Sequence, residues 1–369
     1  MADPRIKKLA QVMVHYSLAI QPGQKVYLQT APAAHEFNLA FYEEAIKAGA
    51  NVTIVIDGGY PGAQEIFLKH ASQKQLEFIS PVRKLMIETY DARMVVEADT
   101  NTRELAGIDP KKISQWRKAN APLFQKMVKR IEKGELKWCL TVIPTDAAAQ
   151  EANMSLSDYS EFVFEAGMLN AKDPVALWKA ERTKQLKLVN WLKGKEQVAL
   201  KGDNIDLSFS IKGRTFIPCA GEENFPDGEI FTSPVENSVN GWVRFKYPAI
   251  FDGQEIEDIE LWFEKGKVMQ EKAQRNQELL TAQLNTDKGA RYLGEWGIGT
   301  NYNIKKFTKN MLFDEKLGGT IHLALGLGFA EAGGKNTSGL HWDMLCDMGK
   351  SEVIIDGKLF YKNGKPVIK

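Results

Sequence analysis

The sequence predicts a two-part fold, with an α/β N-terminal domain built on a largely parallel sheet and a strand-rich α+β C-terminal domain. Its 369 residues exceed what one hydrophobic core usually serves. Residues 25–56 read as strand, helix and strand, which is typical of a right-handed parallel unit. After Lys193-Gly-Lys195 the pattern changes to short strands joined by hairpin turns. We therefore place a domain boundary near residue 195, giving domains 1–195 and 196–369.

The first domain alternates helices and strands along its length. The pattern predicts helices at 6–19, 35–48 and 112–133, and strands at 25–29, 52–56, 84–87, 92–97 and 138–143. The strand at 52–56 ends in Asp57-Gly58-Gly59, which invites a nucleotide-binding interpretation with Asp57 on a ribose. The turn after the first strand, residues 30–35, has none of the glycines that bring a backbone close to a pyrophosphate. We therefore expect no nicotinamide or flavin cofactor.

The chain between the two domains and the second domain follow a different pattern. Residues 146–194 read as bridging helices, and Asp173-Pro174 is typical of a helix start. Strands are expected at 197–201, 205–211, 214–219, 241–250, 255–264, 267–271 and 320–325, with a helix at 276–284. Turns at Ile355-Asp-Gly-Lys358 and Lys362-Asn-Gly-Lys365 predict further hairpins at the C-terminal end.

Composition restricts the possible partners and the compartment. A net charge of +1 argues against nucleic acid or an anionic membrane as the main partner, because both need a dense basic face. No apolar run approaches the roughly 20 residues that span a bilayer. The three cysteines are odd in number and widely spaced, so the sequence indicates neither a disulfide framework nor a zinc knuckle. We expect a cytoplasmic protein.

Three side chains in residues 318–343 have the chemistry of metal ligands. His322 lies in a predicted strand bounded by glycines, and His341 and Asp343 alternate in a second predicted strand, so they share one face. The turn-rich segment 333–339 can fold the second strand back toward the first. Two imidazoles and a carboxylate on one surface begin a divalent-metal site. One satisfied core histidine beside an unrelated surface pair is the alternative.

Two glutamates extend this candidate site. Glu229 follows the turn Pro226-Asp-Gly228, and Glu295 lies in an apolar, glycine-rich segment where an unpaired charge is costly to bury. Glu229 could instead be an exposed acid in a turn, and Glu295 could be the partner of an arginine or a free surface acid. Together with the histidines and Asp343 they are about the number of ligands that hold two divalent ions. The His-Glu-x-x-His motif of mononuclear zinc proteases is absent.

Four motifs in the second half resemble those of the thermophilic metallo-aminopeptidases of the aminopeptidase T type. They are Pro226-Asp-Gly-Glu-Ile-Phe-Thr-Ser-Pro234, Ala290-Arg-Tyr-Leu-Gly-Glu295, His322-Leu-Ala-Leu-Gly326 and Asn336-Thr-Ser-Gly-Leu-His-Trp-Asp-Met344. In the first half, Ile20-Gln-Pro-Gly-Gln-Lys-Val26 and residues 144–156 are also similar to that family. The order and spacing of the motifs agree over the whole second half.

The resemblance implies a metal-dependent aminopeptidase that removes N-terminal residues from peptides with a dinuclear divalent-metal site. The implied metal ligands are Glu229, Glu295, His322, His341 and Asp343, and the implied ions are zinc or cobalt, with manganese as a further possibility. Glu229 or Glu295 is the candidate for proton transfer between water and the leaving amine. The family also implies a homodimer and makes the C-terminal domain the catalytic one.

The sequence departs from the family at one position near the implied metals. The family commonly has a tyrosine seven residues after the first histidine, and this chain has Phe329. A phenyl ring cannot donate a hydrogen bond to a developing oxyanion, so Tyr302 or a backbone amide would have to do so. A metal-dependent amidase acting on blocked or non-peptide amides is therefore an alternative function. A non-catalytic metal-containing binding protein is the alternative from a different class.

Overall fold

The structure is a computed structural model that describes residues 3–56, 60–251 and 253–368. Contacts divide the chain into two compact units, Met1–Val175 with Gly221–Pro226, and Ala176–Ala220 with Asp227–Lys369. The domain boundary expected near residue 195 lies within the second unit and stays a prediction. Asp57, considered above for a ribose contact, lies outside the described residues.

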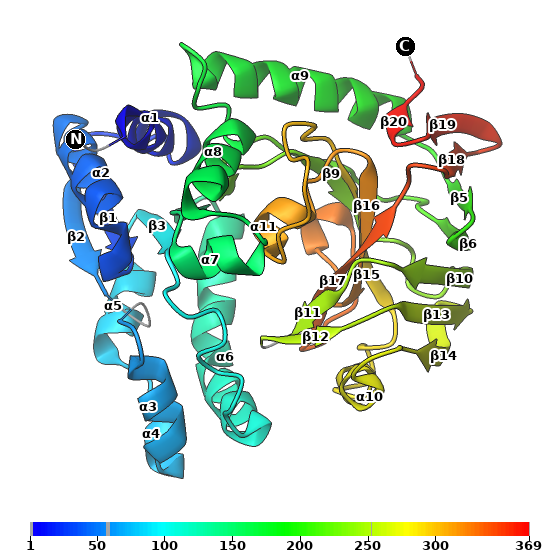
Figure 1. Ribbon diagram of the computed structural model, residues 1–369, viewed down its shortest axis with the longest axis horizontal. Coiled ribbons are helices and arrows are strands. Elements are labelled where there is room, and N and C mark those ends of the chain that lie inside the picture. Colours follow the sequence, from blue (N-terminus) through cyan, green and yellow to red (C-terminus); the bar gives the residue numbers. More distant parts are fainter. Residues whose placement is uncertain (1–2, 57–59, 252, 369) are drawn as a thin grey trace. The chain divides into compact units, whose positions relative to one another are not determined.

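The first unit is built on a five-stranded sheet in which every pair of neighbouring strands is parallel (Figure 1). Its strand order is β2-β1-β3-β4-β8. The strands are β1 (Lys25–Gln29), β2 (Asn51–Val55), β3 (Ala92–Glu97), β4 (Lys137–Val142) and β8 (Asn224–Phe225). The parallel sheet predicted for the N-terminal part is confirmed. The short strand β8 belongs to this sheet although it lies far later in the sequence.

Helices connect these strands, and several begin at the sequence signals that favour a helix start. Asp3, Ser80 and Asp109 each accept a hydrogen bond from a backbone N–H of the first turn, and a proline follows each of them. The helices are α1 (Pro4–Val12), η1 (Met13–Ser17), η2 (Pro32–Ala34), α2 (His35–Lys47), α3 (Ala63–His70), α4 (Gln73–Leu76), α5 (Pro81–Thr89), α6 (Pro110–Glu132), α7 (Asp146–Glu151) and α8 (Leu156–Ala166).

One expected strand is wrong. Residues 84–87 lie inside helix α5, not in a strand. The apolar run Leu85-Met86-Ile87 is too short to distinguish the repeat of a strand from the repeat of a helix. The helix start at Ser80-Pro81 decides in favour of the helix.

The second unit contains two antiparallel sheets and the small β11–β12 hairpin. The eight-stranded sheet has the order β14-β13-β10-β6-β5-β18-β19-β20, and the five-stranded sheet has the order β17-β16-β15-β9-β7. The strands are β5 (Gln197–Gly202), β6 (Ile205–Ser210), β7 (Ile217–Cys219), β9 (Glu229–Thr232), β10 (Asn240–Phe245), β11 (Ala249–Phe251), β12 (Gln254–Ile256), β13 (Ile259–Glu264), β14 (Lys267–Lys272), β15 (Leu293–Gly299), β16 (Thr320–Gly326), β17 (His341–Asp347), β18 (Glu352–Ile355), β19 (Lys358–Lys362) and β20 (Lys365–Pro366). The strand-rich second part predicted by the sequence is confirmed.

Three further helices and a short 3-10 turn follow in the described part of the chain. They are α9 (Pro174–Leu192), α10 (Gln277–Leu284), α11 (Met311–Asp314) and η3 (Ala330–Ala332). No helix in the described ranges has both the length and the apolar character needed to cross a membrane.

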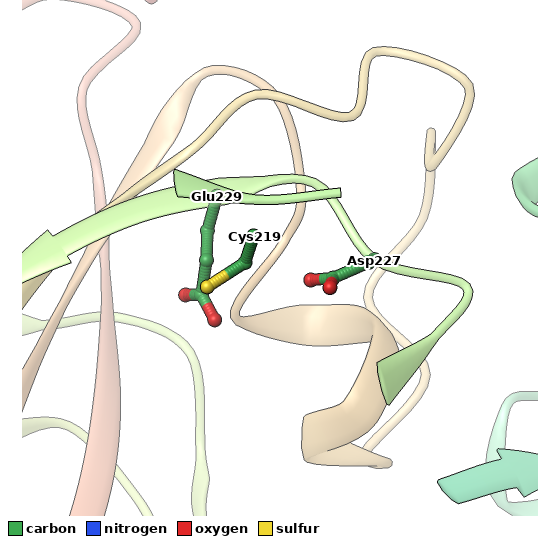
Figure 2. Close-up of side chains that lie close together, drawn as sticks. All are labelled: Cys219, Asp227 and Glu229. Atoms are coloured by element: carbon green, nitrogen blue, oxygen red, sulfur yellow. The ribbon is translucent and has the colours of Figure 1, made fainter. Parts of the chain in front are cut away.

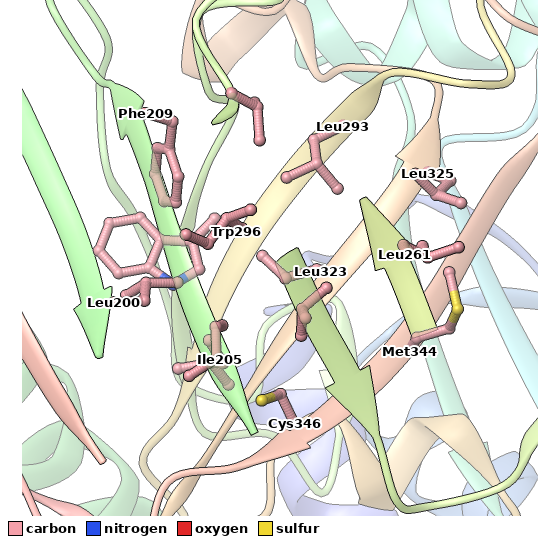
Figure 3. Packing of buried hydrophobic residues seen from close by; sticks show 14 of the residues in the cluster. Leu200, Ile205, Phe209, Leu261, Leu293, Trp296, Leu323, Leu325, Met344 and Cys346 are labelled. Carbon is pink, nitrogen blue, oxygen red and sulfur yellow. The ribbon is translucent and has the colours of Figure 1, made fainter. Parts of the chain in front are cut away.

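The hydrophobic core of the second unit takes side chains from both antiparallel sheets (Figure 3). Leu200 and Leu261 come from the eight-stranded sheet, and Trp296, Leu323 and Met344 come from the five-stranded sheet. Because side chains alternate between the two faces of a strand, the residues between these core positions point to the opposite face of the five-stranded sheet. That opposite face carries the candidate site.

Candidate metal centre

Strands β16 and β17 supply three of the five predicted ligands by simple alternation. On β16, Ile321 and Leu323 lie in the core, so His322 between them faces the other way. On β17, Trp342 lies in the core, so His341 and Asp343 share the opposite face. The two strands pair in antiparallel register, as the turn-rich connection predicted.

Strand β15 reaches the same face with Glu295 through a β-bulge. Its pairing with β16 shifts register between Leu293 and Glu295. Leu293 and Trp296 can therefore both lie in the core, while Glu295 lies on the site face. Glu229 begins β9, the next strand in the sheet, and Ile230 after it lies in the core. The structure therefore brings all five predicted ligands to one face of one sheet.

Small residues make room for the large side chains on this face. Ala324 of β16 lies between Glu295 and Asp343, as the register of the neighbouring strands shows. Gly297 lies beside His322, and a Cβ added at Gly297 would fall 2.0 Å from two atoms of the imidazole. The imidazole of His322 therefore lies over the backbone of β15 in space that only glycine leaves open.

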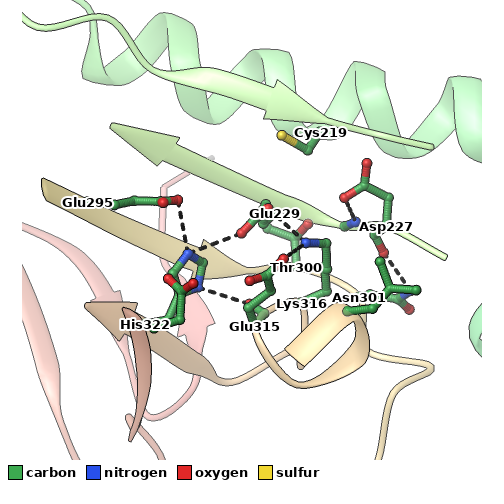
Figure 4. A network of polar contacts seen from close by, with 12 residues as sticks. Cys219, Asp227, Glu229, Glu295, Thr300, Asn301, Glu315, Lys316 and His322 are labelled. Carbon is green, nitrogen blue, oxygen red and sulfur yellow. Dashed lines mark hydrogen bonds and ion pairs between the residues drawn. The ribbon is translucent and has the colours of Figure 1, made fainter. Parts of the chain in front are cut away.

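The five side chains form two overlapping groups of three. In the first group, His322 Nε2 lies 3.2 Å from Glu295 Oε1 and 3.2 Å from Glu229 Oε2 (Figure 4). In the second group, His341 Nε2 lies 3.3 Å from Glu295 Oε2 and 3.5 Å from Asp343 Oδ2. Within each group the possible ligand atoms lie within 4.8 Å of one another, and Glu295 belongs to both.

Both histidines have the orientation that metal binding requires. Nδ1 of His322 lies 3.1 Å from the carbonyl oxygen of Glu315, and Nδ1 of His341 lies 3.1 Å from that of Leu327. A carbonyl oxygen only accepts, so each Nδ1 donates. Nε2 of each ring therefore faces the carboxylates, as a donor when the ring is charged and as a metal ligand when the ring is neutral. The donor set therefore fits divalent ions.

Two buried carboxylate oxygens support the same fit. Glu229 Oε2 and Asp343 Oδ1 are buried without a hydrogen-bond partner among the described residues. Buried polar atoms are usually satisfied, and an orphaned carboxylate oxygen beside an imidazole nitrogen is what an ion-binding site presents.

The electrostatics of the cluster favour positive charge. Burial by itself would lower the pKa of both histidines, but the surrounding carboxylates outweigh it and raise the pKa of His322 and of His341 to about 10. Burial raises the pKa of Glu229 to about 8 and that of Asp343 to about 6. For Glu295 burial acts in the same direction, but hydrogen bonds from both imidazoles outweigh it and lower its pKa to about 2. The carboxylates around Glu295 therefore favour the positively charged form of both imidazoles.

Lys316 and Glu315 belong to the site, although the sequence did not single them out. The side chain of Lys316 is fully buried, and its Nζ donates to Glu229 Oε1 at 3.0 Å and to a carboxylate oxygen of Glu315 (Figure 4). The available signal was a run of three charged residues, Asp314-Glu315-Lys316, in an otherwise apolar stretch, residues 311–317, just before the strand that carries His322.

A third group with metal-binding chemistry shares Glu229. Cys219, Asp227 and Glu229 place possible ligand atoms within 4.8 Å of one another, and Figure 2 shows the three side chains together. Asp227 Oδ1 accepts from the N–H of Gly228 at 2.9 Å, and its carbonyl oxygen accepts from Asn301 Nδ2 at 2.8 Å. These two bonds fix the turn from which Glu229 starts.

Phe329 lies against the cluster. Its ring makes an edge contact with the ring of His341 at 5.0 Å between centroids and with Phe231 at 5.2 Å. Tyr302, considered above as a substitute hydrogen-bond donor, instead donates its hydroxyl to the carbonyl oxygen of Gly364 at 2.9 Å. The place beside His341 is therefore held by an apolar ring.

Comparison with known proteins identifies relatives over the whole chain. The family model described as thermophilic metalloprotease (M29) matches residues 2–369. The chain is 27% identical to aminopeptidase T of Thermus thermophilus, over 97% of this chain and 95% of that protein. It is 25% identical to aminopeptidase AmpS of Bacillus subtilis, over 98% of each. Its fold is similar to the solved structure of wild-type AmpT from Thermus thermophilus, with a TM-score of 0.86, 24% identity and 99% of each chain covered.

Proposed function

Because this chain belongs to the thermophilic metalloprotease family M29, whose model matches residues 2–369, we propose that it is an aminopeptidase with a dinuclear metal site. Membership of a metalloprotease family makes it a metal-dependent hydrolase. The substrates we propose are peptides with a free N-terminus. The names of the curated relatives, aminopeptidase T and aminopeptidase AmpS, support that choice.

The position of Glu295 in both groups of three is the observation that carries the proposal of two ions. One ion would be held by Glu229, Glu295 and His322, and the other by Glu295, His341 and Asp343. Divalent ions bound there supply Lewis-acid polarisation of the scissile carbonyl and lower the pKa of a water molecule toward neutrality. Mixed nitrogen and oxygen ligands suit zinc or cobalt, with manganese as a further candidate.

The side chains of this protein have separate tasks in the proposed reaction. Glu229 and Glu295 are the two candidates for carrying a proton from water to the leaving amine. The hydrogen bonds from His322 to Glu315 and from His341 to Leu327 hold both rings in the tautomer that leaves Nε2 available.

We also propose a cytoplasmic homodimer that does not act on nucleic acid. No disulfide joins the three cysteines, which fits a reducing compartment. The net charge of +1 gives no basis for a nucleic-acid partner. The dimer rests on the resemblance to the aminopeptidase T type, and sedimentation of the purified protein tests it.

An amidase that acts on blocked or non-peptide amides is the second candidate, and Phe329 favours it. The phenyl ring beside His341 offers no hydrogen bond to a substrate oxygen, whereas a phenol at the same place would. A hydrolase that relies less on that donor, or that binds a more apolar substrate, would tolerate the ring.

One experiment separates the two candidates. Metal-stripped protein is assayed on leucine amide and on N-acetyl leucine amide, before and after addition of zinc, cobalt or manganese. We expect the added ion to restore cleavage of the free-amino substrate alone. Cleavage of the acetylated substrate alone would establish the amidase. Cleavage of neither, with metal bound, would contradict both.

A further inference from the structure

Lys316 occupies a position that a lysine rarely takes. Its side chain has no exposed surface, and its Nζ lies between the carboxylates of Glu229 and Glu315. A buried ammonium is stable only when it is paired and hydrogen-bonded, and here two carboxylates do both. Lys316 lies in the short segment between α11 and β16, ahead of the strand that carries His322.

Glu229 has two oxygens in two different environments. Oε1 accepts from Lys316 Nζ at 3.0 Å, and Oε2 lies 3.2 Å from His322 Nε2 without a hydrogen-bond donor among the described residues. Fixing one oxygen of a carboxylate fixes the plane in which the other lies. The ammonium therefore determines where Oε2 points.

We propose that Lys316 is a positioning residue that orients Glu229, so that Glu229 presents Oε2 to the ion held with Glu295 and His322. This inference rests on the proposed dinuclear site and adds a residue to it. Lys316 acts on one group of ligands only. Within the described residues its ammonium donates to no member of the group formed by Glu295, His341 and Asp343.

Lys316 is held by two carboxylates of the protein itself, Glu229 and Glu315. Neither pairing involves a bound ion, so both can hold Glu229 in place before an ion enters the site. The site is thereby preorganised for the ion held by Glu229, Glu295 and His322.

Two variants and a control test the inference by metal binding. Lys316→Met has a similar length but neither charge nor donor, whereas Lys316→Gln keeps an N–H donor without the charge. Lys309→Met is the matched control, because Lys309 pairs with Glu255 at 2.9 Å and contacts none of the five predicted ligands. Each protein is dialysed against buffered free zinc and its bound metal is measured at each concentration.

We expect Lys316→Met to weaken one of the two bound equivalents by about 10- to 100-fold, the loss typical when a group that orients a ligand is removed. The other equivalent should bind as in the parent. Lys316→Gln should lose less zinc affinity than Lys316→Met, and Lys309→Met should bind zinc like the parent. Activity of Lys316→Met should return at high zinc, because affinity for the ion is what the variant lacks.

Unchanged binding of both equivalents in Lys316→Met would overturn the inference, as would an equal loss of both in a folded protein. If circular dichroism shows that Lys316→Met is unfolded, Lys316→Gln decides in the same way. The parent protein separates this failure from failure of the proposed function. A parent that binds fewer than two equivalents refutes the dinuclear site, whereas a parent and a Lys316→Met variant that both bind two equivalents refute only the role of Lys316.

Discussion

At the scale of single residues, we expect metal binding to be most sensitive to changes at Glu295, which belongs to both groups of three. Glu295→Gln removes the charge that both imidazoles face at 3.2 and 3.3 Å, and His341→Ala removes a ring from the second group. We expect each variant to lose bound metal and to lower kcat/KM. The loss should exceed the roughly 10- to 100-fold that is typical when a group that only hydrogen-bonds to a metal ligand is removed. Metal analysis and peptide hydrolysis measure both effects.

The control for these variants is Asp347→Asn. Asp347 ends the same strand on the same face as Asp343, and an asparagine keeps its hydrogen bond from the N–H of Gly349 at 2.8 Å. Metal content and activity should match the parent. Full activity in Glu295→Gln or His341→Ala would remove that residue from the ligand set.

Gly297 gives a steric test of the same site. Alanine at this position is compatible with strand backbone, but its Cβ would fall 2.0 Å from the imidazole of His322. We expect Gly297→Ala to displace the ring, to weaken the ion held with Glu229, and to cost about 1–3 kcal/mol in stability from overpacking. Gly107→Ala, where nothing lies within 4 Å of the added Cβ, should behave like the parent. Metal titration and urea unfolding of both variants would show it, and an unaffected Gly297→Ala would contradict the placement of His322.

Asp314 is not one of the five predicted ligands, and its burial should make the stability of the protein depend on pH. Burial raises the pKa of Asp314 to about 8 in the folded protein, well above its ordinary value of 3.8. Between these values the folded state keeps a proton that the unfolded state has lost, so this carboxyl lowers stability as pH rises. Asp314→Asn keeps an acceptor for Thr308 and removes the titration. Its stability relative to the parent should rise from pH 5 to pH 8, by at most about 1.4 kcal/mol per pH unit. Urea unfolding at both pH values tests this, and parallel curves would contradict it.

At the scale of elements, strand periodicity explains how much of the site the sequence could predict. Alternation in β17 places His341 and Asp343 together, and that needs only the two-residue repeat. The bulge that turns Glu295 to the same face depends on the register between β15 and β16, which one sequence does not specify. Lys316 was missed because its role arises from packing against Glu229, which is distant in sequence.

Local sequence signals also explain why the strand expected at residues 84–87 was wrong. Residues 84–87 offered a short apolar run, and period alone cannot separate a buried strand from a helical turn in so few residues. The strong helix start at Ser80-Pro81 was the decisive signal. Parallel and antiparallel sheets, in contrast, were predictable because their connections differ, with helices between the strands of the first unit and tight turns between many strands of the second.

At the scale of the whole molecule, metal binding should stabilise one part of the chain more than the other. All five predicted ligands lie on β9, β15, β16 and β17, which belong to the second unit. An ion that binds only the folded state adds stability by mass action, about 2.7 kcal/mol when its free concentration is 100 times the dissociation constant. If the two domains predicted to part near residue 195 unfold separately, only the transition of the C-terminal domain should move to higher temperature with zinc.

Calorimetry of metal-stripped and zinc-loaded protein, with hydrogen exchange to assign each transition, measures this effect. We expect β15 to β17 to gain protection, while β1, β3 and β4 of the parallel sheet exchange as before. Equal gains in both sheets would mean that the chain unfolds as one cooperative unit, which would contradict the two separately folding domains but not the metal site. No gain in either sheet would contradict the metal site itself, because a ligand that binds the native state must stabilise it.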